Sequence, residues 1–187
     1  MANSNNAENV SVGKPMTGGA IFIAPAGTAL PTDATTALTE AFKNLGYVSE
    51  DGVTNEIETD SEEIKAWGGD IVLNPQTSRS EQFTYTLIEQ NENAFKHVFG
   101  KDNVTVEPES GAITIKHNAN NREESVVVIE TLLSGNKVKR QVIPRGQISE
   151  LGEIAYKDDE AIGYEVTLKA LLDSEGNTAY EYIAGIK

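Results

Sequence analysis

The sequence predicts a mainly β protein, an antiparallel β-sandwich or barrel with one short flanking α-helix. Many short apolar runs are separated by turn residues, and from residue 103 onward the pattern is nearly all of the β type. Phe83, Tyr85 and Leu87 alternate with polar residues, which is the period of a half-buried strand. The chain contains no internal repeat, and its composition does not distinguish a barrel from a sandwich.

The chain length of 187 residues favours one domain. We expect residues 1–17, which are polar, to form a flexible N-terminal arm, and residues 18–187 to form a single β domain. The arm is either loose, as free termini often are, or ordered against a neighbouring subunit. The sequence starts without a signal-peptide pattern and has no apolar run of membrane-spanning length, so we expect a protein kept in a cytoplasm.

The first elements follow from short local patterns. Residues 18–25 predict a strand that ends at Pro25, and a loop rich in Ala, Pro and Thr follows it. Apolar residues at positions 38, 41, 42 and 45 have helical spacing. They predict a short helix that ends at Gly46.

The next region predicts strands and turns. Asp51 and Gly52 form a dipeptide that is typical of a two-residue hairpin turn. Residues 62–67 predict a short extended segment before a Gly–Gly pair, and residues 80–90 predict the half-buried strand.

Residues 91–100 predict the clearest helix. Asn91 or Asn93 can cap its start, and Gly100 can end it. Three apolar residues form one stripe that we expect to pack on the end of a sheet: Phe95, Val98 and Phe99. His97 falls on the opposite face of this helix, so we expect it in solvent.

The second half predicts strands throughout. Valines at 104 and 106 should meet isoleucines at 113 and 115 across a turn. Residues 125–133 form a continuous apolar run, which indicates a strand covered on both faces. Further strands are predicted at residues 137–143, 147–156, 162–169 and 179–186.

The residues offer no recognisable catalytic chemistry. Cysteine is absent, and His97 and His117 are the only imidazoles, so no zinc site can be assembled from the sequence pattern. No phosphate-binding loop or nucleophile elbow occurs. We therefore assign no catalytic, cofactor-binding or metal-binding residue, expect no cofactor, and predict that the protein is not an enzyme.

Two other classes of protein fit the sequence less well. A metal-dependent β-barrel enzyme of the cupin type would need more histidines. A carbohydrate-binding module or adhesin often exposes several aromatic residues on one face, whereas this chain has one tryptophan, Trp67. A residue in that position before two glycines is more often a core or interface residue.

Charge is placed unevenly along a chain whose net charge is -14. Such a chain should repel nucleic acid rather than bind it through a basic face. One segment is strongly acidic: Glu56, Glu58, Asp60, Glu62 and Glu63. Another is basic and contains no acid: Lys137, Lys139, Arg140 and Arg145. These are either two solvated hairpins or complementary contacts between neighbouring copies.

Three regions together resemble a known family. Residues 18–27 lead through the Ala/Pro/Thr loop to 42–52; the acidic residues 56–60 precede 64–69; and residues 163–168 run into 173–183. In order and spacing these regions resemble the major tail tube proteins of long-tailed, non-contractile phages, the siphophage tail tube family.

The resemblance implies a structural virion protein with the tail-tube fold. Members of that family form hexameric rings that stack into a hollow tube, and their inner strands join across subunits. The lumen holds the tape measure protein and later conducts DNA, without specific DNA binding. The implied partners are further copies, the tape measure protein, the tail terminator and the baseplate or tail-tip initiator, with no membrane. The implied location is the phage tail, assembled in the host cytoplasm.

The same resemblance suggests roles for the charged segments. We expect the acidic residues from Glu56 to Glu63 at the lumen or at the contact between rings. Residues 1–17 and 50–70 are candidates for ordering on assembly. The alternative function is the ring-forming tube protein of a contractile injection or type VI secretion-like apparatus.

Overall fold

The protein is built on one antiparallel sheet of nine strands, in the order β3-β2-β10-β11-β12-β7-β4, with β1 beside β10 and β13 beside β11. The structure is a computed structural model, and it describes residues 5–185. The nine strands are β1 (Gly13–Pro15), β2 (Ile21–Pro25), β3 (Lys43–Asn44), β4 (Val48–Ser61), β7 (Gln76–Leu87), β10 (Ser125–Leu133), β11 (Lys137–Leu151), β12 (Tyr164–Ala170) and β13 (Tyr180–Gly185). This architecture confirms the mainly β prediction.

Within residues 5–185, two short hairpins, one α-helix and two 3-10 turns lie outside the nine-stranded sheet. Two short hairpins pair β5 (Ile64–Lys65) with β6 (Ile71–Leu73), and β8 (Val104–Val106) with β9 (Ile113–Ile115). The helix α1 spans Glu92–Phe99, and 3-10 turns span Ala7–Asn9 and Lys101–Asn103. The pairing of Val104 with Ile115 and of Val106 with Ile113 is the pairing that the sequence predicted.

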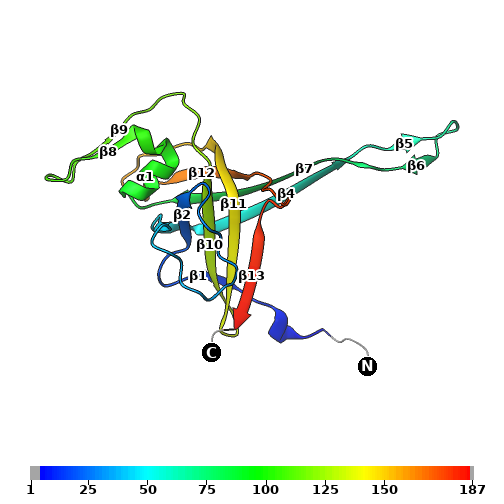
Figure 1. Cartoon of the computed structure of the whole chain (residues 1–187), viewed down its shortest axis with the longest axis horizontal. Coiled ribbons are helices and arrows are strands. Elements are labelled where there is room, and N and C mark those ends of the chain that lie inside the picture. The colour runs from blue at the N-terminus through cyan, green and yellow to red at the C-terminus, as the bar shows by residue number, and fades with distance from the viewer. Residues whose placement is uncertain (1–4, 186–187) are drawn as a thin grey trace.

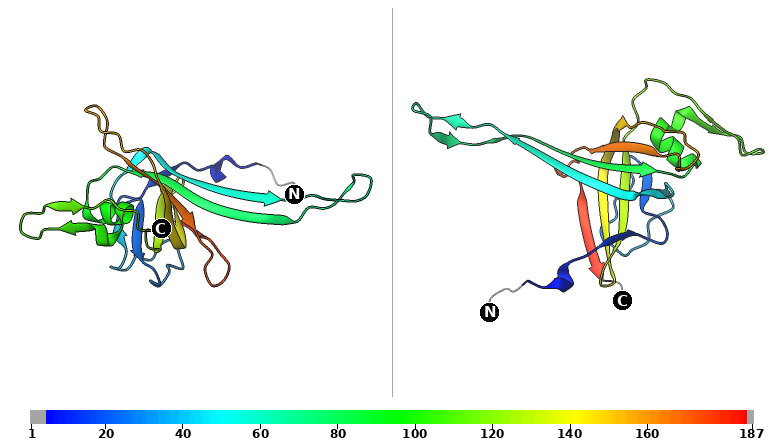
Figure 2. Two further views of the ribbon diagram at one scale, coloured as in Figure 1. Left: turned by 90° about the horizontal axis from the view of Figure 1, so that it is seen from above. Right: turned by 180° about the vertical axis from the view of Figure 1, so that it is seen from behind.

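The sheet bends into two layers because β11 belongs to both. Its first part pairs with β10 and β13, and its last part pairs with β12, which continues into β7 and β4. The register shifts near Ser125 on β10 and near Ile148 on β11, and such irregularities bend strands. Figures 1 and 2 show β10, β11 and β13 running across the direction of β12, β7 and β4, so the layers face each other as in a sandwich.

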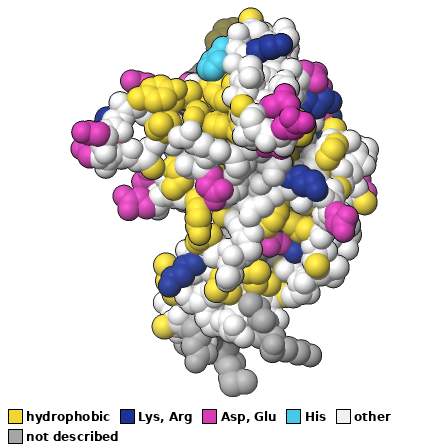
Figure 3. All heavy atoms as spheres, turned by 90° about the vertical axis from the view of Figure 1, so that its left-hand side faces the viewer, with side chains coloured by type: hydrophobic (Ala, Val, Ile, Leu, Met, Phe, Trp, Pro, Cys, Tyr) yellow, Lys and Arg dark blue, Asp and Glu magenta, His cyan; other side chains and the backbone are white. Residues whose placement is uncertain are grey.

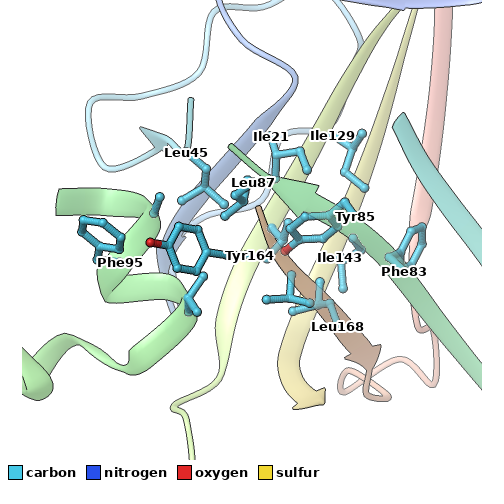
Figure 4. Close-up of a cluster of buried hydrophobic side chains, with 14 of the residues drawn as sticks. Ile21, Leu45, Phe83, Tyr85, Leu87, Phe95, Ile129, Ile143, Tyr164 and Leu168 are labelled. Atoms are coloured by element: carbon cyan, nitrogen blue, oxygen red, sulfur yellow. The ribbon is translucent and has the colours of Figure 1, made fainter. Parts of the chain in front are cut away.

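The main core fills the space between these layers. Figure 4 shows side chains from both layers and from α1 pointing toward one another. Its labelled members are buried: Ile21, Leu45, Phe83, Tyr85, Leu87, Phe95, Ile129, Ile143, Tyr164 and Leu168. A second, smaller cluster lies on the other face of β10 and β11 and includes Phe42, Val126, Val128 and Val142. Strand β10 is therefore covered on both faces, as its continuous apolar run predicted.

The helix α1 forms where the sequence predicted it. The Asn91 side chain accepts a hydrogen bond from the Ala94 N–H at 2.9 Å, and Gly100 ends the helix at a φ of 94°. Phe95, Val98 and Phe99 are buried, and the rings of Phe95 and Phe99 meet the ring of Tyr164 edge-on.

The prediction for His97 was wrong. Its side chain is buried, with 6% of its surface exposed, and its Nε2 lies 2.6 Å from the Tyr85 hydroxyl oxygen. The helix is covered on more than one side, so the face opposite the Phe95 stripe is also packed. Burial lowers the pKa of His97 to about 4, and burial raises the pKa of Tyr85, so both groups are neutral near pH 7.

The predicted helix at residues 38–45 is also wrong. This segment is a loop that ends in β3, which pairs with β2. Phe42 packs in the small cluster and Leu45 in the main core. Their apolar spacing therefore serves two different cores rather than one helix face.

Asp51–Gly52 forms a bulge rather than a hairpin turn. The pairing moves from Val48 opposite Leu87 to Val53 opposite Tyr85, so extra residues of β4 are accommodated within one strand. Gly52 has a φ of 71°, a conformation that glycine adopts without strain. The strands predicted at 137–143 and 147–156 form one strand, β11, which ends at Leu151, so residues 152–156 are not part of a strand.

Part of the predicted N-terminal arm contacts the body of its own chain. Strand β1 pairs with β10, and Gly13 lies opposite Leu133. Residues 1–4 of the arm lie outside the described residues, and so does Ile186 at the end of the predicted last strand. The flexibility of residues 1–17 stays a prediction.

Candidate functional site

A long hairpin leaves the body of the protein. We define the hairpin as residues 55–80 and its tip as residues 62–74. Figures 1 and 2 show β4 and β7 running together away from the two layers and ending in β5 and β6. Strand β7 changes character along its length, because residues 76–79 are exposed whereas every second residue from Glu81 to Leu87 is buried. The hairpin therefore has regular pairing but no core of its own.

The acidic residues predicted as a site lie on this hairpin. Glu56, Glu58 and Asp60 are exposed at alternate positions of β4, so they share one face. Their partners across the strand pair are polar and uncharged: Gln82, Ser80 and Ser78. Two of these partners donate to the acids, Gln82 to Glu56 at 2.6 Å and Ser78 to Asp60 at 2.7 Å. The result is a ridge of negative charge without a cation opposite it.

The other two predicted acids, Glu62 and Glu63, lie at the tip. Glu63 lies 3.4 Å from the Lys65 ammonium, and both groups are exposed. An exposed pair of this kind contributes little to stability. The five acids are thus brought onto one structure, but they divide between the face of β4 and the tip.

The tip exposes apolar side chains. Trp67 is fully exposed, and four further side chains are each about half exposed: Ile64, Ile71, Val72 and Leu73. A tight turn holds them, in which Ala66 N–H donates to the Asp70 carbonyl at 2.8 Å and Gly68 and Gly69 have positive φ angles. Trp67 is therefore not a core residue. Clusters of this kind usually mark contact sites.

A buried carboxylate holds the root of the hairpin. Glu81 is 6% exposed and accepts hydrogen bonds from Thr178, from Arg79 at 2.9 Å and from Asn55 at 3.1 Å. Burial opposes ionisation, but the hydrogen bonds outweigh it and lower the pKa of Glu81. This network connects the hairpin to the segment before β13. The predictions from sequence did not include this network, although Glu81 lies on the same face of β7 as Phe83, Tyr85 and Leu87.

The predicted basic residues do not form one patch. Arg140 is 4% exposed, and its guanidinium donates to Glu130 and to the carbonyls of Asp33 and Thr36. It is satisfied within the chain and is not accessible to a neighbouring copy.

The other three basic residues are spread along β11. Lys139 pairs with Glu181 at 2.8 Å, and Arg145 pairs with Glu124 at 2.8 Å. Within residues 5–185, Lys137 forms no ion pair. Two of these three charges are therefore already balanced in the chain, and Lys137 is the one most available to a partner.

A groove lies at the end of the molecule away from the hairpin. This end groove encloses about 720 Å³ beside α1 and the end of β2. Its apolar lining includes Ile23, Pro25, Ala26, Ala41 and Ile148, and its basic lining is Lys43, Lys96, Lys101 and Arg122. Figure 3 faces this end of the protein and shows hydrophobic side chains at the surface between charged ones. His97 also lines the groove.

The described part of the chain contains no group of three or more His, Cys, Asp or Glu residues that could hold a metal ion. Of the helices in residues 5–185, none has the length and hydropathy needed to cross a membrane.

Comparison with known proteins shows the family to which the chain belongs. A family model described as "Phage tail tube protein" matches residues 3–185. No curated protein matches the chain. Among solved structures, the chain is similar to the cryo-EM structure of the anti-feeding prophage cap, described as the AFP tube terminating cap. The TM-score is 0.46 and the identity is 12%, over 95% of this chain and 97% of that chain. Since the family model covers nearly the whole sequence, this chain belongs to the phage tail tube protein family, a family of structural virion proteins.

Proposed function

We propose that this chain assembles into stacked hexameric rings that form the tail tube, the conduit for phage DNA into the host. The observation that carries the proposal is the hairpin, which keeps its strand pairing beyond the body although its residues past the root at Asn55 and Arg79 are exposed on both faces. An isolated protein gains no core from such a structure. Neighbouring copies can supply the missing contacts.

Unpaired sheet edges support lateral assembly. In the described residues, β13 pairs only with β11, and β4 pairs only with β7. Each therefore has a free edge of backbone N–H and C=O groups, which can pair with a strand from another chain. A closed ring of copies satisfies edges of this kind, whereas stacking of rings continues without closure and gives a filament.

The acidic ridge supports a role at the lumen or between rings. Glu56, Glu58 and Asp60 face solvent together, and the net charge of the chain is -14. At physiological salt the Debye length is about 8 Å, so a negative wall repels phosphates near it without filling a wide channel. This arrangement suits a conduit that DNA passes without adhering.

The proposal includes the partners that tail tubes have. These are further copies of the chain, the tape measure protein in the lumen, the tail terminator and the baseplate or tail-tip initiator. Assembly takes place in the host cytoplasm, and the product is part of the virion. The match to phage tail tube proteins favours this function over the tube of a contractile injection apparatus.

Electron microscopy tests the proposal directly. Negatively stained, concentrated purified protein should form hollow tubes with a regular axial repeat and sixfold end views, either alone or on addition of tail-tip initiator proteins. The protein would not be a tube subunit if it remained a compact single particle at every concentration and beside the initiators.

Lys137 tests the contribution of the basic segment. Lys137→Glu reverses an unpaired charge on β11 and should slow the growth of tubes when it is mixed with wild-type protein. Lys157→Glu is a matched control, because Lys157 is exposed and its one ion pair within residues 5–185 is with Glu160 in the same loop. Equal growth of the two mixtures would remove Lys137 from the contact.

A further inference from the structure

We propose that the hairpin tip of one copy docks into the end groove of another copy, with Trp67 as the central residue of the contact. This inference rests on the proposed function and gives it a specific pair of surfaces.

The tip has the apolar composition of a protein interface, but its side chains are exposed. Five exposed hydrophobic side chains lie within ten residues: Ile64, Trp67, Ile71, Val72 and Leu73. Tryptophan in particular is enriched among the residues that dominate binding energy at interfaces. The turn at Gly68 and Gly69 holds this cluster at the end of the hairpin, so the body of its own chain cannot cover it.

The end groove has the size and lining to receive such a cluster. Its volume of about 720 Å³ is within the range of about 300–1,000 Å³ that is typical of ligand pockets. Its walls include residues of β2, of α1 and of the loop before β10. An apolar side chain that enters it is removed from water.

The charges of the two surfaces are complementary. Three acids and one base lie at the tip, namely Glu62, Glu63, Asp70 and Lys65. Four basic and two acidic side chains line the groove, and the two acids, Glu123 and Glu124, are already paired with Lys101 and Arg145. Lys43 and Arg122 form no ion pair within residues 5–185, and the Arg122 Nε–H donates to the Val98 carbonyl at 3.1 Å, so Lys43 is the cation most available to the tip. A locally positive groove in a chain with a net charge of -14 favours an acidic partner.

The positions of the two surfaces require a second copy. The tip lies at one end of the longest axis of the molecule, whereas α1 and β2, whose residues line the groove, lie on the opposite side of the body (Figures 1 and 2). A tip therefore cannot reach the groove of its own chain. When one copy docks into the next, the second copy still offers a free tip, so the contact is head-to-tail and propagates. This is the kind of contact that a growing tube uses.

The fluorescence of Trp67 tests the docking without a label, because Trp67 is the only tryptophan of the chain. In the unassembled protein its emission should be that of an indole in water, with strong quenching by acrylamide. On tube formation the emission should shift to shorter wavelength and the quenching should fall several-fold. Tubes in which Trp67 remains fully quenchable would overturn the docking while leaving the tube function intact.

Cysteine pairs identify where the tip goes, since the natural chain has no cysteine. A Val72→Cys variant carries a thiol at the tip, and an Ala26→Cys variant carries one in the groove. Under mild oxidation the two variants mixed in tubes should give a disulfide-linked dimer. A mixture of Val72→Cys with Ser174→Cys, which lies in an exposed turn, should not.

The outcomes separate this inference from the proposed function. Tubes with the Val72–Ala26 crosslink support the inference. Tubes without that crosslink, or with equal crosslinking to position 174, overturn it alone. Failure of the wild-type protein to form tubes overturns both. If instead Trp67 emission shifts only on addition of vesicles of phosphatidylcholine and phosphatidylglycerol, the tip binds lipid and the docking is wrong.

Discussion

The body and the hairpin of this protein use the same antiparallel pairing for opposite purposes. In the body, β7 alternates buried Phe83, Tyr85 and Leu87 with residues that face outward, and the buried side chains fill one core. In the hairpin, residues of the same strand are exposed on both faces. The comparison teaches that strand pairing alone does not identify a folded core. The burial pattern separates the part that stabilises the monomer from the part that is free to contact other copies.

The largest expected difference concerns stability. Phe83→Ala should lower the free energy of unfolding of the unassembled protein by about 3–5 kcal/mol, because it leaves a cavity in the main core. Ile57→Ala, at a hairpin position that is about half exposed, should change it by less than about 0.5 kcal/mol. Denaturant unfolding of the two variants measures both values. Equal losses would mean that the hairpin is part of the cooperative core.

The next largest effect is a pH dependence of the stability, which arises from His97 in the body. Burial lowers the pKa of His97 to about 4 from an ordinary value near 6.5, so the unfolded chain binds a proton more readily than the folded chain. Stability should therefore fall as the pH falls from about 6.5 toward 4, by about 3 kcal/mol in total.

His97→Asn should remove this component of the pH dependence, and the difference between its unfolding curve and that of the wild type isolates it from the titration of carboxylates. His117→Asn is the matched control, because His117 is exposed. A wild-type stability that is flat between these pH values would contradict the prediction.

A smaller effect is expected at the junction of the two regions. Glu81→Ala removes the acceptor shared by Thr178, Arg79 and Asn55, and the loss of a buried, charged hydrogen-bond partner costs about 1–3 kcal/mol. Amide hydrogen exchange should become faster at the root of the hairpin and before β13, with less change in β10.

The same exchange measurement on monomer and tube tests which segments order on assembly. Residues 1–17 and 50–70 should be better protected in the tube. Equal protection in both states would show that they contribute no new contacts.

A substitution of Trp67 should have the smallest effect on stability but a large effect on assembly. Trp67→Ala should change the free energy of unfolding by less than about 0.5 kcal/mol, since the side chain contacts no core. It should raise the concentration needed for tube growth by more than about tenfold if Trp67 dominates a contact. Tyr156→Ala, another exposed aromatic residue, should leave that concentration unchanged. Equal tube growth of the two variants would show that Trp67 does not contribute to assembly.

Much of the body could be predicted because each of its sequence patterns indicates one burial environment. The alternation of Phe83, Tyr85 and Leu87, the continuous run of β10 and the capped helix at Asn91 each report a single burial environment. The errors arose where one short pattern served two environments. Phe42 and Leu45 enter different cores, and the helix that carries His97 is covered on two sides.

The candidate site was harder to predict. The acids of the hairpin were identified by their density along the chain, but the length of the hairpin was not, because a segment exposed on both faces has no apolar period. Arg140 was grouped with its sequence neighbours, although its partners Glu130 and the loop at Asp33 are distant in sequence or on another strand. The exposure of Trp67 likewise depends on the tertiary position of the tip.

Strand β11 has a mechanical consequence, since it belongs to both layers. A pull on the hairpin passes sideways from β4 and β7 into β12, and from β12 into β11, which is also bonded to β10 and β13. Between β4, β7 and β12, which run along the direction of the pull, the load is carried as shear that many backbone bonds share at once. The two layers are therefore joined by continuous strand pairing, and a force on the hairpin reaches the second layer through backbone hydrogen bonds rather than through side-chain packing alone.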